Sequence, residues 1–285
     1  EETIKLMPMK AMQKTLNWEA VRAPININKK KLANRSAIIR SDSGELLGLR
    51  SNQYRLFTNK DFKELVNRVV LKTGYNLVGY QEFRKGKRVI AYLKLSDACL
   101  PNGASPLKIC GNETADYMLI GNSHDGSSAL FISFTNVLLR CENQFTTPLR
   151  LLNMRHLANI SFDDYLLDKV IRNYHNERDQ LYGMMVQWTE ISLTKSSVDR
   201  LIIDLVPAKH ASSDCPEVDR KRRGLRSSIN REITELGFNY WGLFNGVTHY
   251  TTGRTASSLF GNPYSEGNKL NKKAMNFIKN EIDSL

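Results

Sequence analysis

Residues 58–95 read TNKDFKELVNRVVLKTGYNLVGYQEFRKGKRVIAYLKL and hold the clearest structural pattern of the chain. Thr58 or Asn59 can cap a helix, because a short polar side chain accepts hydrogen bonds from the free N–H groups of the first turn. Gly74 is a typical helix end. Between these positions the apolar residues recur at helical spacing: Phe62, Leu65, Val66, Val69 and Val70. We therefore predict one amphipathic helix.

The second part of this stretch predicts a β-hairpin. Residues 77–83 and 89–95 are rich in strand-forming side chains and flank a polar turn at 84–88. Two further hairpins have the same form, with strands 37–40 and 45–49 around the turn 41–44, and strands 117–121 and 128–134 around 122–127. The last turn contains Asp125-Gly126, a dipeptide that favours tight turns. The front of the chain thus consists of antiparallel hairpins with a packed helix.

After Phe134 the apolar spacing changes and favours helices. We expect a helix carrying Val137, Leu138, Cys141 and Phe145, which Pro148 would disturb. Further helices are predicted from a capping box at 161–164 to Trp188, and over 198–205, 220–236 and 268–282. The expected fold class is α+β, with antiparallel β-hairpins and a packed helix in the N-terminal half and a helical C-terminal half. We expect a hairpin-rich α+β core over 1–149 and a mainly helical region with basic helices over 150–285.

Composition bounds the class of protein. The 285 residues include 41 Lys and Arg against 29 Asp and Glu, a formal net charge of +12. A basic balance favours polyanionic partners such as nucleic acid. No apolar run approaches the roughly 18 residues of a membrane span, so we expect a soluble protein without a membrane partner. The cysteines lack C-x-x-C pairing, which indicates reduced thiols and a cytoplasmic location: Cys99, Cys110, Cys141 and Cys215.

Signatures of catalysis are missing from the sequence. The segment 79–88 is the nearest approach to a phosphate-binding loop, but its glycines are too far apart and Arg88 stands where Ser or Thr is needed. No nucleophile elbow, zinc-protease helix or dinucleotide turn occurs. We therefore assign no catalytic residue, no metal ligand and no cofactor, and expect a protein that is not an enzyme. His124-Asp125 is the best remaining candidate, because an imidazole and a carboxylate at an exposed hairpin tip suit acid–base work or metal binding. The alternative is that Asp-Gly simply makes the turn.

Clusters of cations are the strongest functional signal. Residues 220–226 hold five bases in two helical turns, and like charges at this density repel unless an anion relieves them. Other clusters are Lys29–Lys31, the turn 84–88 and Lys269/Lys272/Lys273. Aromatic residues near some of them could stack on bases: Phe83, Tyr92, Tyr240, Trp241, Phe244, Tyr250 and Tyr264. The candidate nucleic-acid-binding residues are Arg84, Lys85, Lys87, Arg88, His124, Arg140, Arg150, Arg155, Arg220, Lys221, Arg222, Arg223 and Arg226.

Several ordered motifs resemble a known family. They are residues 39–48 (IRSDSGELLG), 52–55 (NQYR), 122–127 (NSHDGS), 140–143 (RCEN), 244–250 (FNGVTHY) and 259–261 (LFG). In this order they resemble the phage/plasmid-like proteins, a domain of unknown function. The resemblance implies a mobile-element origin and assigns no catalytic residue. The predicted order of hairpins and helices also resembles the single-strand annealing proteins of the recombination-mediator superfamily, which implies a basic groove and assembly into rings or filaments.

These observations lead to one main hypothesis and one alternative. The main hypothesis is a single-stranded DNA-binding protein, an annealing or recombination factor of a phage or plasmid. It would act as a homo-oligomer, a ring or filament, in the cytoplasm of a bacterial host cell. The alternative is a metal-dependent nuclease or other DNA-modifying enzyme that uses His124 and Asp125.

Overall fold

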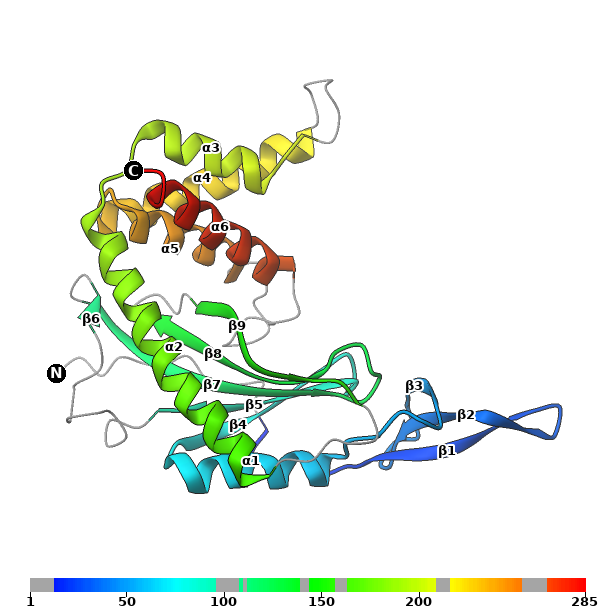
Figure 1. Ribbon diagram of the computed structural model, residues 1–285. Coiled ribbons are helices and arrows are strands. Elements are labelled where there is room, and N and C mark those ends of the chain that lie inside the picture. Colours follow the sequence, from blue (N-terminus) through cyan, green and yellow to red (C-terminus); the bar gives the residue numbers. More distant parts are fainter. Residues whose placement is uncertain are drawn as a thin grey trace.

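The computed structural model describes residues 13–95, 108–109, 112–138, 144–156, 163–208, 216–252 and 266–285. They form two antiparallel sheets and six helices, with the helices mostly in the second half of the chain. The α+β class is therefore confirmed. Figure 1 shows three parts: a central sheet, a group of helices above it and a narrow β-structure that projects to one side.

The central sheet holds the middle of the chain. Its strands are β4 (Asn76–Phe83), β5 (Arg88–Lys94), β7 (Asn112–Ser123), β8 (Leu130–Leu138) and β9 (Gln144–Met154), in spatial order β4-β5-β7-β8-β9, and β6 (Lys108–Ile109) pairs with β7. Alternating residues of these strands face opposite sides of the sheet. Val89, Ala91 and Leu93 belong to the main core with the helices, whereas Ile90 and Tyr92 belong to a smaller buried cluster on the other face.

Helix α1 (Asn59–Thr73) has the ends that the sequence predicts. Thr58 is the N-cap and forms a reciprocal capping box with Asp61, and Gly74 ends the helix in a left-handed conformation with φ of 70°. The side chains of Phe62, Val66 and Val69 are fully buried in the main core. The helix therefore packs against the sheet along the face that its apolar spacing predicts.

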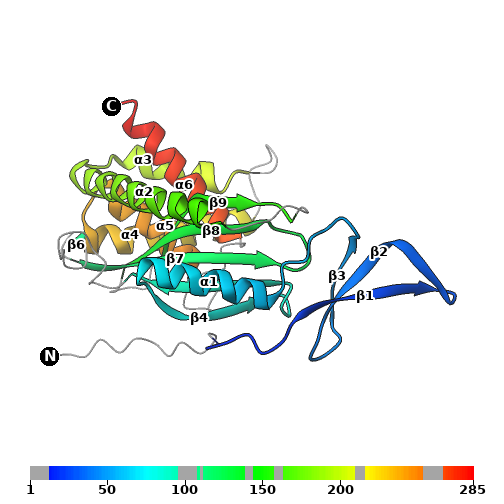
Figure 2. The same ribbon diagram turned by 60° about the horizontal axis from the view of Figure 1, so that its bottom comes forward.

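The projecting structure, here called the arm, spans residues 20–51. It consists of β1 (Ala20–Ile27), β2 (Lys30–Arg40) and β3 (Leu46–Ser51), paired in the order β1-β2-β3. Ile38 and Leu47 are buried and join the arm to the main core. Figures 1 and 2 show β1 and β2 extending away from the body beyond the end of β3.

The helical part contains α2 (Asp164–Glu190), α3 (Lys195–Leu205), α4 (Pro216–Leu236), α5 (Tyr240–Thr252) and α6 (Glu266–Ile282). The long helix α2 runs from α1, where Asp164 pairs with Arg68 at 2.9 Å, toward the other helices (Figure 1). Its N-cap is Asp163, which accepts a hydrogen bond from the Leu166 amide. None of the helices in the described part of the chain has the length and apolarity to cross a membrane.

One expectation about residues 134–149 is wrong. Val137 and Leu138 belong to β8 and Phe145 to β9, so a strand pair stands where we expect a helix. Pro148 is tolerated because β9 is an edge strand and its register with β8 shifts between Ser133 and Thr135. Residue 149 lies inside β9, so the sheet continues past the expected boundary, and the division into two domains stays a prediction.

Helix α5 was not predicted. Nearly all its side chains are buried, from Tyr240 and Trp241 at its start to Thr251 near its end, so it lacks the polar face that marks a surface helix. A Cβ atom on Gly246 would lie 2.4 Å from Cα of Ile229, which shows how closely α5 packs on α4.

Candidate nucleic-acid interface

Strands β1 and β2 of the arm form a long cationic segment that contains no acidic residue. From Ala20 to Arg40 the chain has six basic residues and no acidic one. The tip carries Lys29, Lys30 and Lys31, all exposed. Asn28 and Lys29 form the turn with φ of 50° and 64°, a conformation that two-residue hairpin turns require. The cations therefore lie at the point farthest along the ribbon from the body (Figure 2).

The outer part of the arm is a ribbon of only two strands. Strand β3 pairs with β2 from Ile39 to Arg35, where it reaches its last residue, Ser51. Asn52, the next residue, still donates to the carbonyls of Asn34 and Ala33. Beyond a register shift after Pro24, β1 pairs with β2 through Asn26 with Lys31 and Ile27 with Lys30. Every residue from Asn26 to Arg35 is exposed, so both faces of the ribbon contact solvent.

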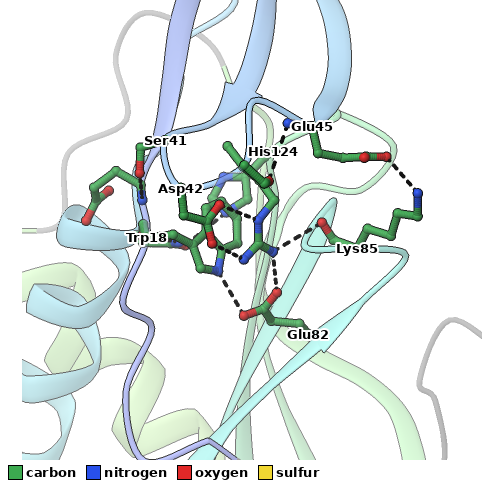
Figure 3. Close-up of polar contacts among 11 residues, drawn as sticks. Trp18, Ser41, Asp42, Glu45, Glu82, Lys85 and His124 are labelled. Atoms are coloured by element: carbon green, nitrogen blue, oxygen red, sulfur yellow. Dashed lines mark hydrogen bonds and ion pairs between the residues drawn. The ribbon is translucent and has the colours of Figure 1, made fainter.

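One side of the arm base is fixed to the body by a mostly buried ion pair. Nη1 of Arg40 lies 2.6 Å from Oε2 of Glu82 on β4, and Nε1 of Trp18 donates to Oε1 of the same carboxylate at 2.8 Å. The guanidinium of Arg40 stacks over the Trp18 ring at 3.9 Å and also binds both carboxylate oxygens of Asp42. Figure 3 shows this junction together with the ion pair of Lys85 and Glu45. Acidic side chains therefore neutralise the cations on this side.

The other side of the arm base is basic and surrounds the β7–β8 turn. The guanidinium of Arg50 packs against Gly126 and lies 5.8 Å above the Tyr54 ring, and Nε of Arg88 donates to Oγ of Ser127 at 2.9 Å. The amide of Arg55 donates to the carbonyl of His156, so the two segments meet, and Arg55 and Arg155 are both exposed there. We call Arg50, Arg55, Arg88 and Arg155 the basal cluster.

Asp125 is an acidic residue within the basal cluster, and its own turn already uses it. Its Oδ1 accepts hydrogen bonds from the amide of Ser127 at 3.0 Å and from its hydroxyl at 2.5 Å. These contacts are those of an Asp that shapes a turn. The structure thus supports the reading in which Asp125-Gly126 makes the turn.

His124 is not at an exposed tip, and that expectation is wrong. Its side chain is fully buried and contacts Trp18 edge-on at a ring separation of 5.4 Å. Asn59 donates through Nδ2 to the Trp18 carbonyl, so its Oδ1 faces Nε2 of His124 at 2.9 Å. Burial lowers the pKa of His124 to about 4, so the imidazole is neutral at neutral pH. It can neither grip a phosphate nor reach a substrate.

The polar residues around His124 attach the segment that follows the arm, residues 54–57, to the sheet. Asn122 donates to the carbonyl of Phe57, and the Tyr54 hydroxyl donates to the carbonyl of Ser123. His156 is also buried, packs on Tyr54 and has a pKa lowered by burial. Among the described residues, no three His, Cys, Asp or Glu side chains are placed to hold a metal ion, and all four cysteines lie outside these residues. The alternative nuclease thus loses the exposed imidazole on which it was built.

The other candidate residues lie in several places. Arg84 and Lys85 are exposed and Lys87 half-buried, all in the β4–β5 turn beside the arm base. Arg150 belongs to β9, and Arg140 lies outside the described residues.

The five cations of α4 belong to the helical part of the molecule, away from the arm in both views (Figures 1 and 2). Several have partners there: Lys221 pairs with Glu217 at 2.6 Å, Arg226 with Asp199 at 2.5 Å, and Arg222 donates to the Val206 carbonyl. Arg220 and Arg223 are exposed. The arm base and α4 are therefore two separate basic regions.

The aromatic residues suggested for stacking are mostly in the core. Tyr92, Tyr240, Trp241 and Phe244 are each exposed by 2% or less, and Tyr250 by 9%. Phe83 is half-buried, and Tyr264 lies outside the described residues. Side chains buried in this way cannot stack on the bases of a ligand, so that part of the sequence interpretation is wrong for these five residues.

Sequence reasoning missed several residues of the arm region: Arg22, Arg35, Arg50 and Arg55. A usable signal was present in the run from 20 to 40, where bases occur without an acid. Arg88 and Arg155 were among the predicted candidates, but their meeting with Arg50 and Arg55 had no signal, because these residues come from three different parts of the chain.

Comparison with known families places the chain. A family described as "Domain of unknown function (DUF932)" matches residues 46–274, which is most of the chain, so the chain belongs to this family. The match begins at the first residue of β3 and leaves β1 and β2 outside it. No curated protein and no solved structure matches the chain.

Proposed function

We propose that this DUF932 protein binds single-stranded DNA and acts as an annealing or recombination factor. The observation that carries the proposal is the basal cluster, which brings four arginines from three segments of the chain to the β7–β8 end of the arm base. Arginine binds phosphate through a planar fork of donors, so such a cluster suits a polyphosphate backbone.

The burial of the aromatic side chains fits this mode of binding. A protein that stacks bases on its own rings withholds those bases from pairing. Here the exposed groups are guanidinium and ammonium groups, which grip phosphates and leave the base edges accessible to a complementary strand. Annealing requires that accessibility.

The proposal includes a biological setting that follows from the family resemblance. We infer a phage or plasmid origin, action in the cytoplasm of a bacterial host and assembly as a ring or filament. The α4 cations would then be a second contact, reached by a strand that continues past the arm base or by a neighbouring copy.

Fluorescence anisotropy with a labelled single-stranded oligonucleotide at two salt concentrations tests the proposal. The test variant changes Arg55, Arg88 and Arg155 to Gln. The matched control changes Lys169, Arg172 and Lys195 to Gln, which removes the same charge from exposed positions of α2 and α3. If all three arginines contact phosphate, the slope of log affinity against log salt falls by about 2 in the test variant. The control keeps the slope of the original protein.

Two results would overturn the proposal. The first is that the unaltered protein does not bind at low salt, where phosphate contacts are strongest. The second is equal loss of affinity in the test and control variants, because binding would then follow total charge and not a site. A third variant, Arg220→Gln with Arg223→Gln, measures whether α4 contributes.

A further inference from the structure

The free part of the arm, residues 26–32, is a short ribbon in which every residue is exposed. A two-stranded hairpin is at best marginally stable in water. A partner that covers the faces of this ribbon would therefore stabilise it. We infer that this ribbon enters the major groove of double-stranded DNA, the product of annealing. The inference rests on the proposed function for its nucleic-acid ligand and adds a second site with a different ligand form.

The dimensions of the ribbon fit that groove. Paired strands lie roughly 5 Å apart, and the major groove of B-DNA, about 12 Å wide, admits a two-stranded β-ribbon. Contact of β2 with the segment that follows β3 ends at Ala33, and the turn lies at Asn28 and Lys29. At about 3.3 Å per residue the free ribbon is roughly 10 Å long, which exceeds the groove depth of about 8.5 Å. The tip can therefore reach base edges while its flanks lie along the phosphates.

The side chains of the ribbon suit a duplex better than a single strand. Residues 20–53 contain no Phe, Tyr, Trp or His, so the arm offers no ring for an unpaired base. It does offer Lys29, Lys30, Lys31 and Arg35 for phosphates and guanine edges. Three amides, those of Asn26, Asn28 and Asn34, can pair with adenine edges.

Exposed apolar side chains add a contact that phosphate binding alone does not explain. Ile27 is 58% exposed and Leu32 is 37% exposed, both close to the lysines of the tip. In a major groove such side chains contact the methyl group of thymine, which only the groove floor presents. Cations, amides and apolar side chains on one narrow ribbon are the groups that proteins use to contact base edges in the major groove.

The arm base holds the ribbon in a fixed direction before a ligand binds. The Glu82 carboxylate accepts hydrogen bonds from Nε1 of Trp18 and Nη1 of Arg40. Ile38 and Leu47 of the arm are buried in the main core. A ribbon oriented in advance loses less conformational entropy on binding than a free hairpin. The basal cluster lies at the foot of the same ribbon, where the backbone of an inserted duplex would pass.

The experiment compares duplex DNA, single-stranded DNA and duplex RNA of matched length by fluorescence anisotropy. The test variant changes Lys29, Lys30 and Lys31 to Gln, and a second changes Ile27 and Leu32 to Ser. These positions are exposed, so folding is expected to persist, and circular dichroism checks it. The triple variant is expected to lose at least roughly tenfold in duplex affinity, with a salt slope lower by about 2.7. Single-strand affinity changes less than threefold. Duplex RNA binds more weakly than duplex DNA, because its major groove is deep and narrow.

The outcomes separate this inference from the proposed function. Equal losses for duplex and single-stranded DNA would overturn the inference and leave the proposed function intact. Single-stranded and duplex binding both absent in the unaltered protein would overturn the two together. Sedimentation analysis tests whether the ribbon binds a second copy of the chain instead of DNA. If the arm variants change the oligomeric state without changing duplex affinity, it does, and the inference is wrong.

Discussion

Acidification should destabilise the protein through His124, which is the buried base of the arm junction. The folded protein holds this imidazole neutral, with its pKa lowered from 6.5 to about 4 by burial. An unfolded chain protonates the same group near pH 6.5, so below that pH unfolding takes up a proton that the folded state refuses. The contribution of His124 to the free energy of unfolding is therefore fully present above about pH 6.5 and is lost as the pH falls toward 4. His156, also buried with a lowered pKa, adds to the loss in the same direction.

The size of the effect follows from that shift. At pH 5 the unfolded imidazole is almost fully protonated, whereas the folded one is almost fully neutral. The free energy of unfolding should fall by about 2 kcal/mol between pH 7.5 and pH 5 from His124 alone. The limit below pH 4 is about 3 kcal/mol.

Urea denaturation at pH 7.5, 6, 5 and 4.5 measures this dependence, with a His124→Gln variant for comparison. The variant loses the 2.9 Å contact with Asn59 and is less stable at pH 7.5, but its stability falls less steeply with acid. The difference between the two slopes isolates His124 from the other histidines. A flat curve for the original protein, or an equally steep one for the variant, would refute the argument, because either result means that the imidazole does not titrate differently in the two states.

Four further substitutions are each tested by urea denaturation. Gly86→Ala should cost about 2–4 kcal/mol, since the added Cβ would lie 2.5 Å from Nη1 of Arg40 at a φ of +89°. Gly44→Ala should cost only about 1–2 kcal/mol, because its φ is +68° with no atom within 4 Å, and equal losses at the two glycines would show that the clash is relieved freely. Thr58→Ala removes the N-cap of α1 and should cost about 1 kcal/mol, whereas no loss would mean that Asp61 caps the helix alone. Glu82→Gln removes one carboxylate partner of Arg40, which keeps Asp42 and the Lys85 carbonyl. The change should cost about 2 kcal/mol and speed proteolysis within the arm; unchanged digestion would show that the ion pair does not hold the arm.

Local signals in the sequence were enough for much of the fold. Thr58 and Gly74 specify both ends of α1 through hydrogen bonds within a few residues, and the three hairpin turns specify their strand pairs in the same way. The region from 134 to 149 failed because its apolar spacing fits a helix, whereas pairing with the neighbouring strands decides its conformation. Helix α5 was missed because it is surrounded by other elements and carries no polar stripe.

The features of the candidate site also fall into those that the sequence determines and those that the tertiary structure determines. Composition alone determined that the chain is basic and that acids are missing from residues 20–40, because charge is a property of the residues themselves. The burial of His124, the neutralisation of Arg40 by Glu82 and the gathering of Arg50, Arg55, Arg88 and Arg155 around one turn were decided by the tertiary structure. These features depend on which distant segments meet, and contacts between residues far apart in the chain leave no periodic or short-range trace in the order of the amino acids.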